Sequence, residues 1–450
     1  MENLKKLPPL YKKPLTLSEI ILYNMAGFAF NVYDTVLYMW IIFFYAGVEG
    51  SGEVPFITLS MMGVLLFAGR MLDAVTDPLF GYLSDHTKSR WGRRKPYIFA
   101  AAPVLFLSFI LLWTPPVSGT SAINAVYLAV ILFFYYVSYT AVLIPWFAVL
   151  PEMSPNNDDR VKIASIGVAI GIIGALIAGG ISGPLFNARG IFIMALILGA
   201  VAFVASELTL FGVHERHRLL PGEEAPGFIR TVRELFSDKQ VLSFSAMIMF
   251  VQLTYQLLLM NIPYVVTLIL GKEKEQSSII VGEVIILMAL SVPIWYFLLK
   301  RYAKRKVFRG IILAMMLGFV ACYFIGGLPF PSPFVQAMLI FPLAAIPLGG
   351  VFVVSLGVIS DLTDYGELKN GKRNEAIYFG IYGIVRKTGW AFSGMILSGV
   401  FYYFGYSANN PFGVRLVFLF CALVSLIGLL AFIPYRLGDS KEETKKIMGL

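Results

Sequence analysis

The chain has 450 residues, of which 58% are hydrophobic and only 14% are charged. Soluble domains carry about 25% charged residues, so this composition and the mean hydropathy of +0.76 exclude a soluble globular protein. The net charge of +9 comes from Lys and Arg in short connections between apolar stretches. Such charges orient a membrane protein, and we expect no nucleic-acid partner.

Apolar runs follow one another along the chain, and each predicts a membrane-spanning helix because about 20 apolar residues cross a bilayer. The sequence therefore predicts an all-α membrane protein with twelve spans, whose even number places both termini on one side. The runs lie at 18–46, 55–83, 96–114, 121–151, 160–186, 189–213, 241–269, 277–300, 307–327, 332–360, 375–404 and 411–435.

The basic connections predict which side that is. Lys and Arg gather at 88–95, after the second run, and at 300–306, after the eighth. Connections on the other side are nearly free of Lys and Arg, so the positive-inside rule places the two basic connections and both termini in the cytoplasm.

One long polar stretch divides the runs six and six. We therefore expect an N-terminal six-helix bundle with a cation site at 1–213, a cytoplasmic linker at 214–240 and a C-terminal six-helix bundle at 241–450. A faint repeat relates the halves, since Pro151-Glu152 at the end of the fourth run is echoed by Asp361 to Asp364 at the end of the tenth. Two related bundles are typical of a transporter.

Ionisable residues inside a span are functional hypotheses, because each costs about 2.5 to 3.5 kcal/mol to insert. The second run carries Arg70, Asp73 and Asp77, and the two aspartates share one helix face. Thr76 adds a hydroxyl, which completes an oxygen-only donor set that suits a monovalent cation such as Na⁺. The alternative is that these carboxylates pair with Arg70 or Lys387 and lock helices together; both roles are compatible.

Polar residues in other runs are candidates for binding a solute. Asn31, Asp34 and Tyr38 in the first run suit a polyol, although Asp34 is equally a candidate ion partner or a group satisfied by another helix. In the fourth run Thr140 stands out beside Trp146, and Asn261-Ile262-Pro263 predicts a bend in the seventh. The remaining candidates are Tyr255, Gln256, Phe352, Tyr378, Tyr382, Arg386 and Lys387.

One extended pattern resembles the signature of the glycoside-pentoside-hexuronide:cation symporters, within the major facilitator superfamily. It consists of Arg70, Asp73, Asp77, Pro78, Gly81, Asp85, Thr87, Gly92, Arg93, Arg94 and Pro96. The likeness extends over the whole chain, including IPWFAVLP at 144–151 and DLTDYGE at 361–367.

The resemblance implies a major facilitator fold and cation-coupled symport of a sugar or glycoside across the cell membrane by alternating access. It implies cation ligation by Asp73, Thr76, Asp77 and Thr140, with Lys387 and Arg70 as charge partners. The family's sugar-binding acids and arginine match Asn31, Leu143 and Val168 here, and its helix-four tryptophan matches Phe147, with Trp146 adjacent. Asp34 is one substitute for the missing carboxylate. We expect a cytoplasmic gate formed by Asp85, Arg93, Arg94, Asp361 and Asp364.

Other functions compete with this interpretation. Sodium-dependent lysophospholipid symporters share an Asp-Ala-x-Thr-Asp-Pro pattern, and a non-transporting sensor keeps the same fold. A membrane phosphotransferase uses an aspartate-rich motif, but Ala74 and Ser89 break that pattern. We therefore expect a transporter without enzymatic activity or cofactor, whose partners are a small solute, the bilayer and Na⁺ or H⁺ as coupling ion.

Overall fold

The computed structural model describes residues 15–49, 54–154, 157–215, 237–329, 331–370 and 375–449. Over these residues the chain is helical, with thirteen α-helices and one isolated β-bridge between Glu49 and Ser407. Within these described ranges, ten helical segments are long and apolar enough to cross a membrane. Two further long helices lie outside that set: α3 (Lys95–Leu111) has 17 residues, and α12 (Glu375–Phe404) carries Arg386 and Lys387. The expectation of an all-α membrane protein is confirmed.

The helices form two compact units. The first contains Met1–Leu37 and Met71–Glu224, and the second contains Tyr38–Arg70 and Ala225–Leu450. Two helices, α1 (Leu17–Ala46) and α2 (Leu59–His86), therefore contribute one part to each unit. The predicted domain boundaries at 213 and 241 stay a prediction, and residues 216–236 of the predicted linker lie outside the described residues.

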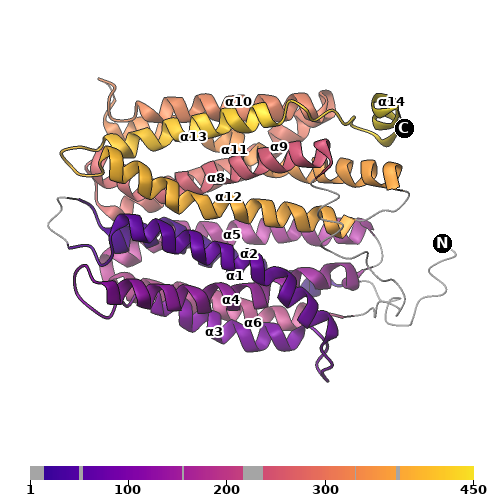
Figure 1. The fold of residues 1–450 in the computed structure, drawn as a ribbon, viewed down its shortest axis with the longest axis horizontal. Helices are drawn as coiled ribbons and strands as arrows, with labels where there is room; N and C mark the ends of the chain where they lie inside the picture. The colour runs from indigo at the N-terminus through magenta and orange to yellow at the C-terminus, as the bar shows by residue number, and fades with distance from the viewer. Residues whose placement is uncertain are drawn as a thin grey trace. The chain divides into compact units, whose positions relative to one another are not determined.

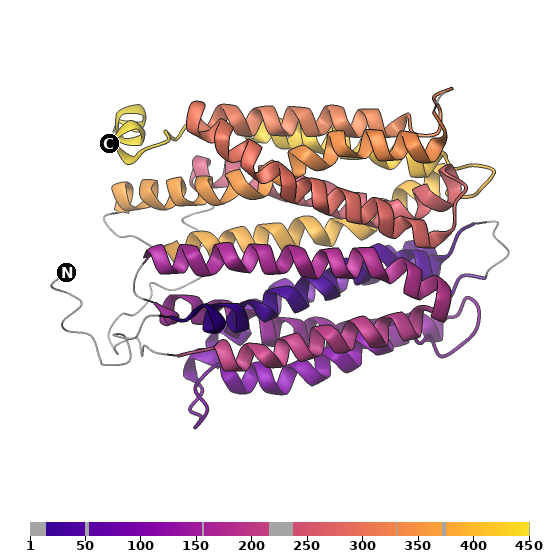
Figure 2. The same cartoon turned by 180° about the vertical axis from the view of Figure 1, so that it is seen from behind.

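In the first unit, α3 packs against α4 and α6, and α5 packs against α6 (Figures 1 and 2). Glycines bring α5 close to α1, because small residues let the backbones of membrane helices approach. A Cβ atom on Gly174 would lie 2.5 Å from the carbonyl oxygen of Phe28. The helix bounds are α4 (Ala122–Met153), α5 (Asn157–Arg189) and α6 (Ile191–Gly212).

In the second unit, α8 packs against α12 and α13, while α11 packs against α9 and α10 (Figure 1). The first half of α2 also contacts α12, where the rings of Phe67 and Phe392 are 5.1 Å apart. The helix bounds are α8 (Lys239–Tyr264), α9 (Ser277–Arg301), α10 (Lys304–Tyr323), α11 (Pro333–Asn370), α13 (Phe412–Ala431) and α14 (Lys441–Met448).

The backbone changes its helical geometry next to the predicted bend in the seventh run. Regular α-helix ends at Tyr264, and a π-helical turn follows at Val265–Ile269. Pro263 has no N–H to donate to the preceding turn. Asn261 donates from Nδ2 to the carbonyl oxygen of Val414 over 2.9 Å, which ties this part of α8 to α13.

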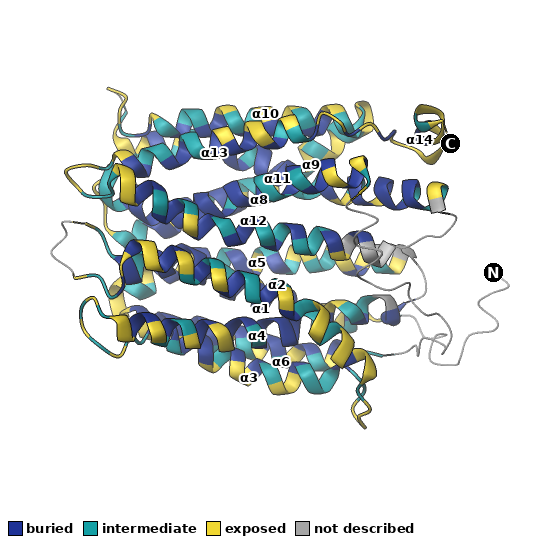
Figure 3. Cartoon of the chain, in the orientation of Figure 1, coloured by how far each residue is buried: buried dark blue, intermediate teal, exposed yellow. Residues whose placement is uncertain are grey.

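Large apolar side chains lie both in the interior and on the surface of the helices, and Figure 3 shows buried and exposed residues along the long helices. Large apolar side chains such as Leu107 and Val75 are exposed on the helices, whereas Arg70, Asp73 and Lys387 are at most 3% exposed. Exposed apolar side chains suit contact with lipid, and buried ionisable side chains mark functional positions in membrane proteins. The buried charges are therefore the first positions to consider as a functional site.

Candidate functional site

The predicted cation ligands meet where α2 and α4 pack in the first unit. Thr140 of α4 donates from its hydroxyl to Oδ1 of Asp73 over 2.5 Å, and both side chains are fully buried. Thr76 lies three residues after Asp73 on the same face of α2, and its hydroxyl is 3.2 Å from that of Thr140. Three of the four predicted ligands are thus in contact.

The fourth predicted ligand, Asp77, is one helical turn beyond Asp73 and is half-buried. Among the described residues no group of three or more His, Cys, Asp or Glu side chains gathers around a point, so the donors here are two carboxylates and two hydroxyls. Such hard oxygen donors fit a cation like Na⁺. Arg70 and Lys387 belong to the second unit, and their predicted pairing with the aspartates stays a prediction.

Arg70 contacts aromatic rings of the second unit. It donates from Nε to the hydroxyl of Tyr38, and its guanidinium lies 5.0 Å from the Tyr38 ring centroid and 5.1 Å from that of Trp390. Tyr38, a predicted substrate residue, is only 1% exposed. In this structure Tyr38 therefore positions Arg70.

The sugar-binding candidates of the first unit differ in their hydrogen-bond partners. Asp34 accepts a hydrogen bond from the Tyr139 hydroxyl over 2.8 Å, and Asn31 is exposed and donates to Gly27 of its own helix. Trp146 is buried and donates from Nε1 to the carbonyl oxygen of Tyr23 over 2.8 Å.

The only polar atom of the Trp146 side chain is therefore hydrogen-bonded inside the unit, whereas the side chain of the next residue, Phe147, is 48% exposed. The rings of Trp146 and Phe147 are 4.6 Å apart. Phe147 is therefore the exposed aromatic side chain of this pair, and its role in binding a solute stays a prediction.

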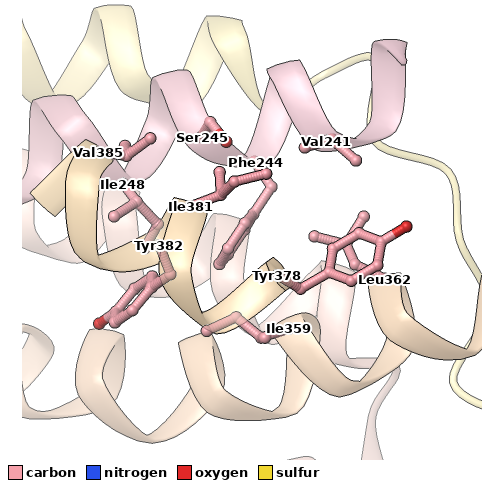
Figure 4. A pocket seen from close by; sticks show the side chains of 10 residues that line it. All are labelled: Val241, Phe244, Ser245, Ile248, Ile359, Leu362, Tyr378, Ile381, Tyr382 and Val385. Carbon is pink, nitrogen blue, oxygen red and sulfur yellow. The ribbon is translucent and has the colours of Figure 1, made fainter. Parts of the chain in front are cut away.

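The candidates of the second unit are predominantly aromatic. The rings of Tyr255 and Phe352 meet edge to face at 5.9 Å, and Gln256 is buried with its Oε1 lacking a hydrogen-bond partner. Tyr382 borders a small cavity of about 10 Å³ between α8, α11 and α12 (Figure 4). Its lining side chains are Val241, Phe244, Ser245, Ile248, Ile359, Leu362, Tyr378, Ile381, Tyr382 and Val385.

Charged residues predicted as a cytoplasmic gate form ion pairs at the end of α4. Glu152 accepts from Arg93 at 2.6 Å and from Arg94 at 3.0 Å, and Arg94 also contacts Asp85 at 2.9 Å. Burial raises the pKa of the Glu152 carboxyl, and the charges of Arg94 and Arg93 offset part of that rise. Sequence reasoning noted Glu152 in the internal repeat but did not assign it to the gate.

Glu215, just after α6, holds the same basic segment through its backbone. Its carboxylate accepts from the amides of Arg93 and Arg94 at 2.6 and 2.8 Å, at the N-terminus of α3, where the helix dipole favours negative charge. Gly92 has φ +107°, and a Cβ there would lie 2.5 Å from Glu215 Oε1. No sequence pattern pointed to Glu215.

The other predicted gate residues lie on α11. Asp361 pairs with Lys304 at 2.6 Å, so this carboxylate meets the second predicted basic connection. Asp364 follows three residues later and is half-buried. The gating role of Asp361 and Asp364 stays a prediction.

Comparisons with known proteins identify the family of the chain. Residues 22–438 match the family model described as MFS/sugar transport protein. The isoprimeverose transporter of Lactiplantibacillus pentosus is 26% identical over 89% of this chain and 83% of its own length. A lactose permease of Lactobacillus delbrueckii subsp. bulgaricus is also 26% identical, over 74% of this chain, which spans 55% of that permease.

A solved structure gives the same fold. A mutant of the nucleoside transporter NupG superposes with a TM-score of 0.68 at 14% identity, covering 92% of this chain and 99% of that chain. These matches exclude the phosphotransferase alternative, because the family consists of membrane transporters and not enzymes. The chain is a multi-pass integral membrane protein that belongs to the MFS/sugar transport family, among the glycoside-pentoside-hexuronide symporters of the major facilitator superfamily.

Proposed function

We propose that the protein is a symporter that uses a monovalent cation to carry a sugar or glycoside across the plasma membrane. The observation that carries this proposal is the contact between Thr140 and the buried carboxylate of Asp73. A carboxylate fully removed from water is costly unless a cation, a proton or hydrogen-bond donors accompany it. The buried carboxylate and the hydroxyl in contact with it are hard oxygen donors of the kind that bind a monovalent cation.

The neighbouring oxygens support Na⁺ as the first cation to test. Asp73, Thr76 and Thr140 supply three oxygens in contact, and Asp77 lies one turn further along α2. The alternative coupling ion is a proton, because two neighbouring carboxylates in a medium of low dielectric constant repel each other unless one of them is protonated. Coupling requires that cation and solute each stabilise the state that binds the other.

The proposal includes twelve spans with both termini in the cytoplasm. A long helix lies at each of the predicted apolar runs, α3 and α12 included. Lys and Arg gather at 88–95 and 300–306, which supports a cytoplasmic location for these connections and hence for both termini.

Relatives favour a sugar as the solute. Proteins named isoprimeverose transporter and lactose permease match most of this chain, which favours a sugar over a lysophospholipid. Each unit has its own candidates for contacting the solute. In the first unit we propose Asn31, Asp34 and Phe147, and in the second unit we propose Tyr255, Gln256, Phe352 and Tyr382.

Uptake into proteoliposomes tests the proposal. A panel of glycosides, pentosides, uronides and one lysophospholipid is offered with and without an inward Na⁺ gradient at clamped pH, and then with a proton gradient. We expect cation-stimulated accumulation of a sugar, and loss of that stimulation in Asp73→Asn.

Asp159→Asn is the matched control, because Asp159 is an exposed aspartate that accepts from the Ser154 hydroxyl over 2.8 Å. Cation-stimulated uptake that persists in Asp73→Asn would refute the site. Uptake of the lysophospholipid alone would refute the sugar.

A further inference from the structure

Arg386 lies on α12 in the second unit and forms no ion pair with any described residue. Its guanidinium lies 4.8 Å from the ring centroid of Trp390 and 6.0 Å from that of Tyr382, and its Nε is buried without a hydrogen-bond partner. The three residues are four apart along α12, so they share one face. Charged side chains in membrane helices normally pair, so an arginine without an ionic partner marks a path for a solute or ion.

Two further cationic side chains lie near this arginine. Arg70 contacts the same indole ring at 5.1 Å, and Lys387, the next residue of α12, is 3% exposed. The two helices that pack most extensively on α12, α8 and α13, contain no Asp or Glu. Within the second unit these helices therefore offer no carboxylate to balance Arg386.

The groups beside Arg386 suit the ring and the hydroxyl groups of a sugar. The indole of Trp390 is oriented by donating from Nε1 to Oε1 of Gln252 over 3.2 Å. Gln256 lies one turn further along α8, and its buried Oε1 lacks a partner. Aromatic faces with a few convergent polar groups are the usual lining of a small-molecule site.

We propose that Arg386 binds the carboxylate of an acidic sugar, and so makes this protein select acidic over neutral glycosides. The inference rests on the proposed function as a sugar symporter. A guanidinium presents parallel N–H donors that match a carboxylate in a bidentate pair. Stacking against Trp390 and Tyr382 holds the plane of the guanidinium without consuming those donors.

Matched pairs of substrates test the proposal directly. Uptake by the proteoliposomes is measured for methyl glucuronide against methyl glucoside and for methyl galacturonide against methyl galactoside, under the driving cation gradient. We expect the wild-type KM to be lower for the acid by about tenfold or more, as for a charge-assisted pair. Arg386→Gln should bring the ratio of the two KM values close to one. Arg386→Lys keeps the positive charge but lacks the parallel N–H donors of the guanidinium, so it should give an intermediate ratio.

Arg301→Gln is the control variant. Arg301 makes the same type of contact, 5.0 Å from the ring centroid of Phe297 one turn earlier, but it is exposed at the end of α9. Its removal should leave the ratio of KM values unchanged. Melting temperatures show whether each variant is folded. If Arg386→Gln is unfolded, the inference is tested by the KM ratio of the wild type and by that of Arg386→Lys.

Two results overturn the inference while leaving the proposed function intact. One is a wild-type protein that prefers the neutral glycosides, and the other is an Arg386→Gln variant whose KM rises equally for acid and neutral partners. The second result would assign Arg386 a positioning role. No uptake of any sugar under either cation gradient would refute the proposed function and the inference together.

Discussion

Thr140 on α4 donates its hydroxyl hydrogen to the carboxylate of Asp73 on α2 across 2.5 Å, with both side chains fully buried. The bond fixes one oxygen of Asp73 and leaves its other oxygen to face a different partner. It also joins two helices of the same unit, so a change in the charge of Asp73 acts on their packing. Coupling between a bound cation and helix movement needs this type of connection.

Thr140→Ala should weaken cation binding. A hydrogen bond to a charged group contributes about 1.5 to 3 kcal/mol, so the cation concentration for half-maximal uptake should rise about tenfold or more. Thr209→Ala is the control, because Thr209 is a buried threonine of α6 that donates only to its own helix, at Ala205. An unchanged cation dependence in Thr140→Ala would remove Thr140 from the site.

Glu152→Gln should destabilise the protein strongly. Glu152 is 5% exposed and contacts both Arg93 and Arg94, so Gln removes the buried counter-charge that these arginines share and leaves Arg94 with only the more exposed Asp85. Breaking a buried pair costs about 3 to 5 kcal/mol, whereas an exposed pair contributes about 1 kcal/mol or less. The melting temperature in detergent should therefore fall far more than in Glu367→Gln, which breaks the exposed pair with Lys441. Equal losses would contradict the importance of the buried network.

Gly174→Ala should disturb the contact between α1 and α5. The added Cβ would lie 2.5 Å from the Phe28 carbonyl oxygen, and overpacking of this type costs about 1 to 3 kcal/mol. Gly180→Ala on the same helix is the control, because its Cβ meets no atom within 4 Å. The melting temperature should fall in the first variant and be unchanged or higher in the second. If both variants behave alike, the close approach of the helices is not required.

The stability of the protein should depend on Asp238 in acid. Burial of its carboxylate favours the neutral form, but hydrogen bonds from Lys369, the amide of Gln240 and Tyr365 outweigh burial and hold its pKa below the ordinary value of 3.8. A group whose pKa is depressed by folding stabilises the protein above its unfolded pKa, and this contribution is lost as the pH falls through the folded pKa.

Asp238→Asn should therefore lower the melting temperature at neutral pH and flatten its decline below about pH 4, since an amide does not titrate there. The measurement is a series of melting curves in detergent from pH 3 to 7. A parallel decline in wild type and variant would show that other carboxylates dominate acid unfolding.

Much of this protein followed from local sequence pattern. Apolar runs and basic connections are physical consequences of the bilayer, which requires hydrophobic length and favours Lys and Arg on one side. Asp73 and Asp77 stood out because a carboxylate inside such a run is costly, and their spacing alone put them on one face. The family signature joined these residues to Thr140.

Other features depended on contacts between distant segments. Trp146 and Phe147 are adjacent aromatics in the sequence, yet only packing against Tyr23 shows that Trp146 is committed to the interior and Phe147 is open. Glu215 carries no motif, and its role arises because the chain after α6 returns to the N-terminus of α3.

Sequence by itself thus determined the class of protein, its helices and the carboxylates of the proposed cation site, because the membrane imposes those rules residue by residue. Tertiary structure alone decided that Thr140 contacts Asp73, that Glu152 joins Arg93 and Arg94, and that Arg386 stacks on Trp390 with no ionic partner in the described part of the chain. Such pairings depend on which faces of separate helices meet. That choice is set by the packing of many side chains at once and is encoded in no single segment.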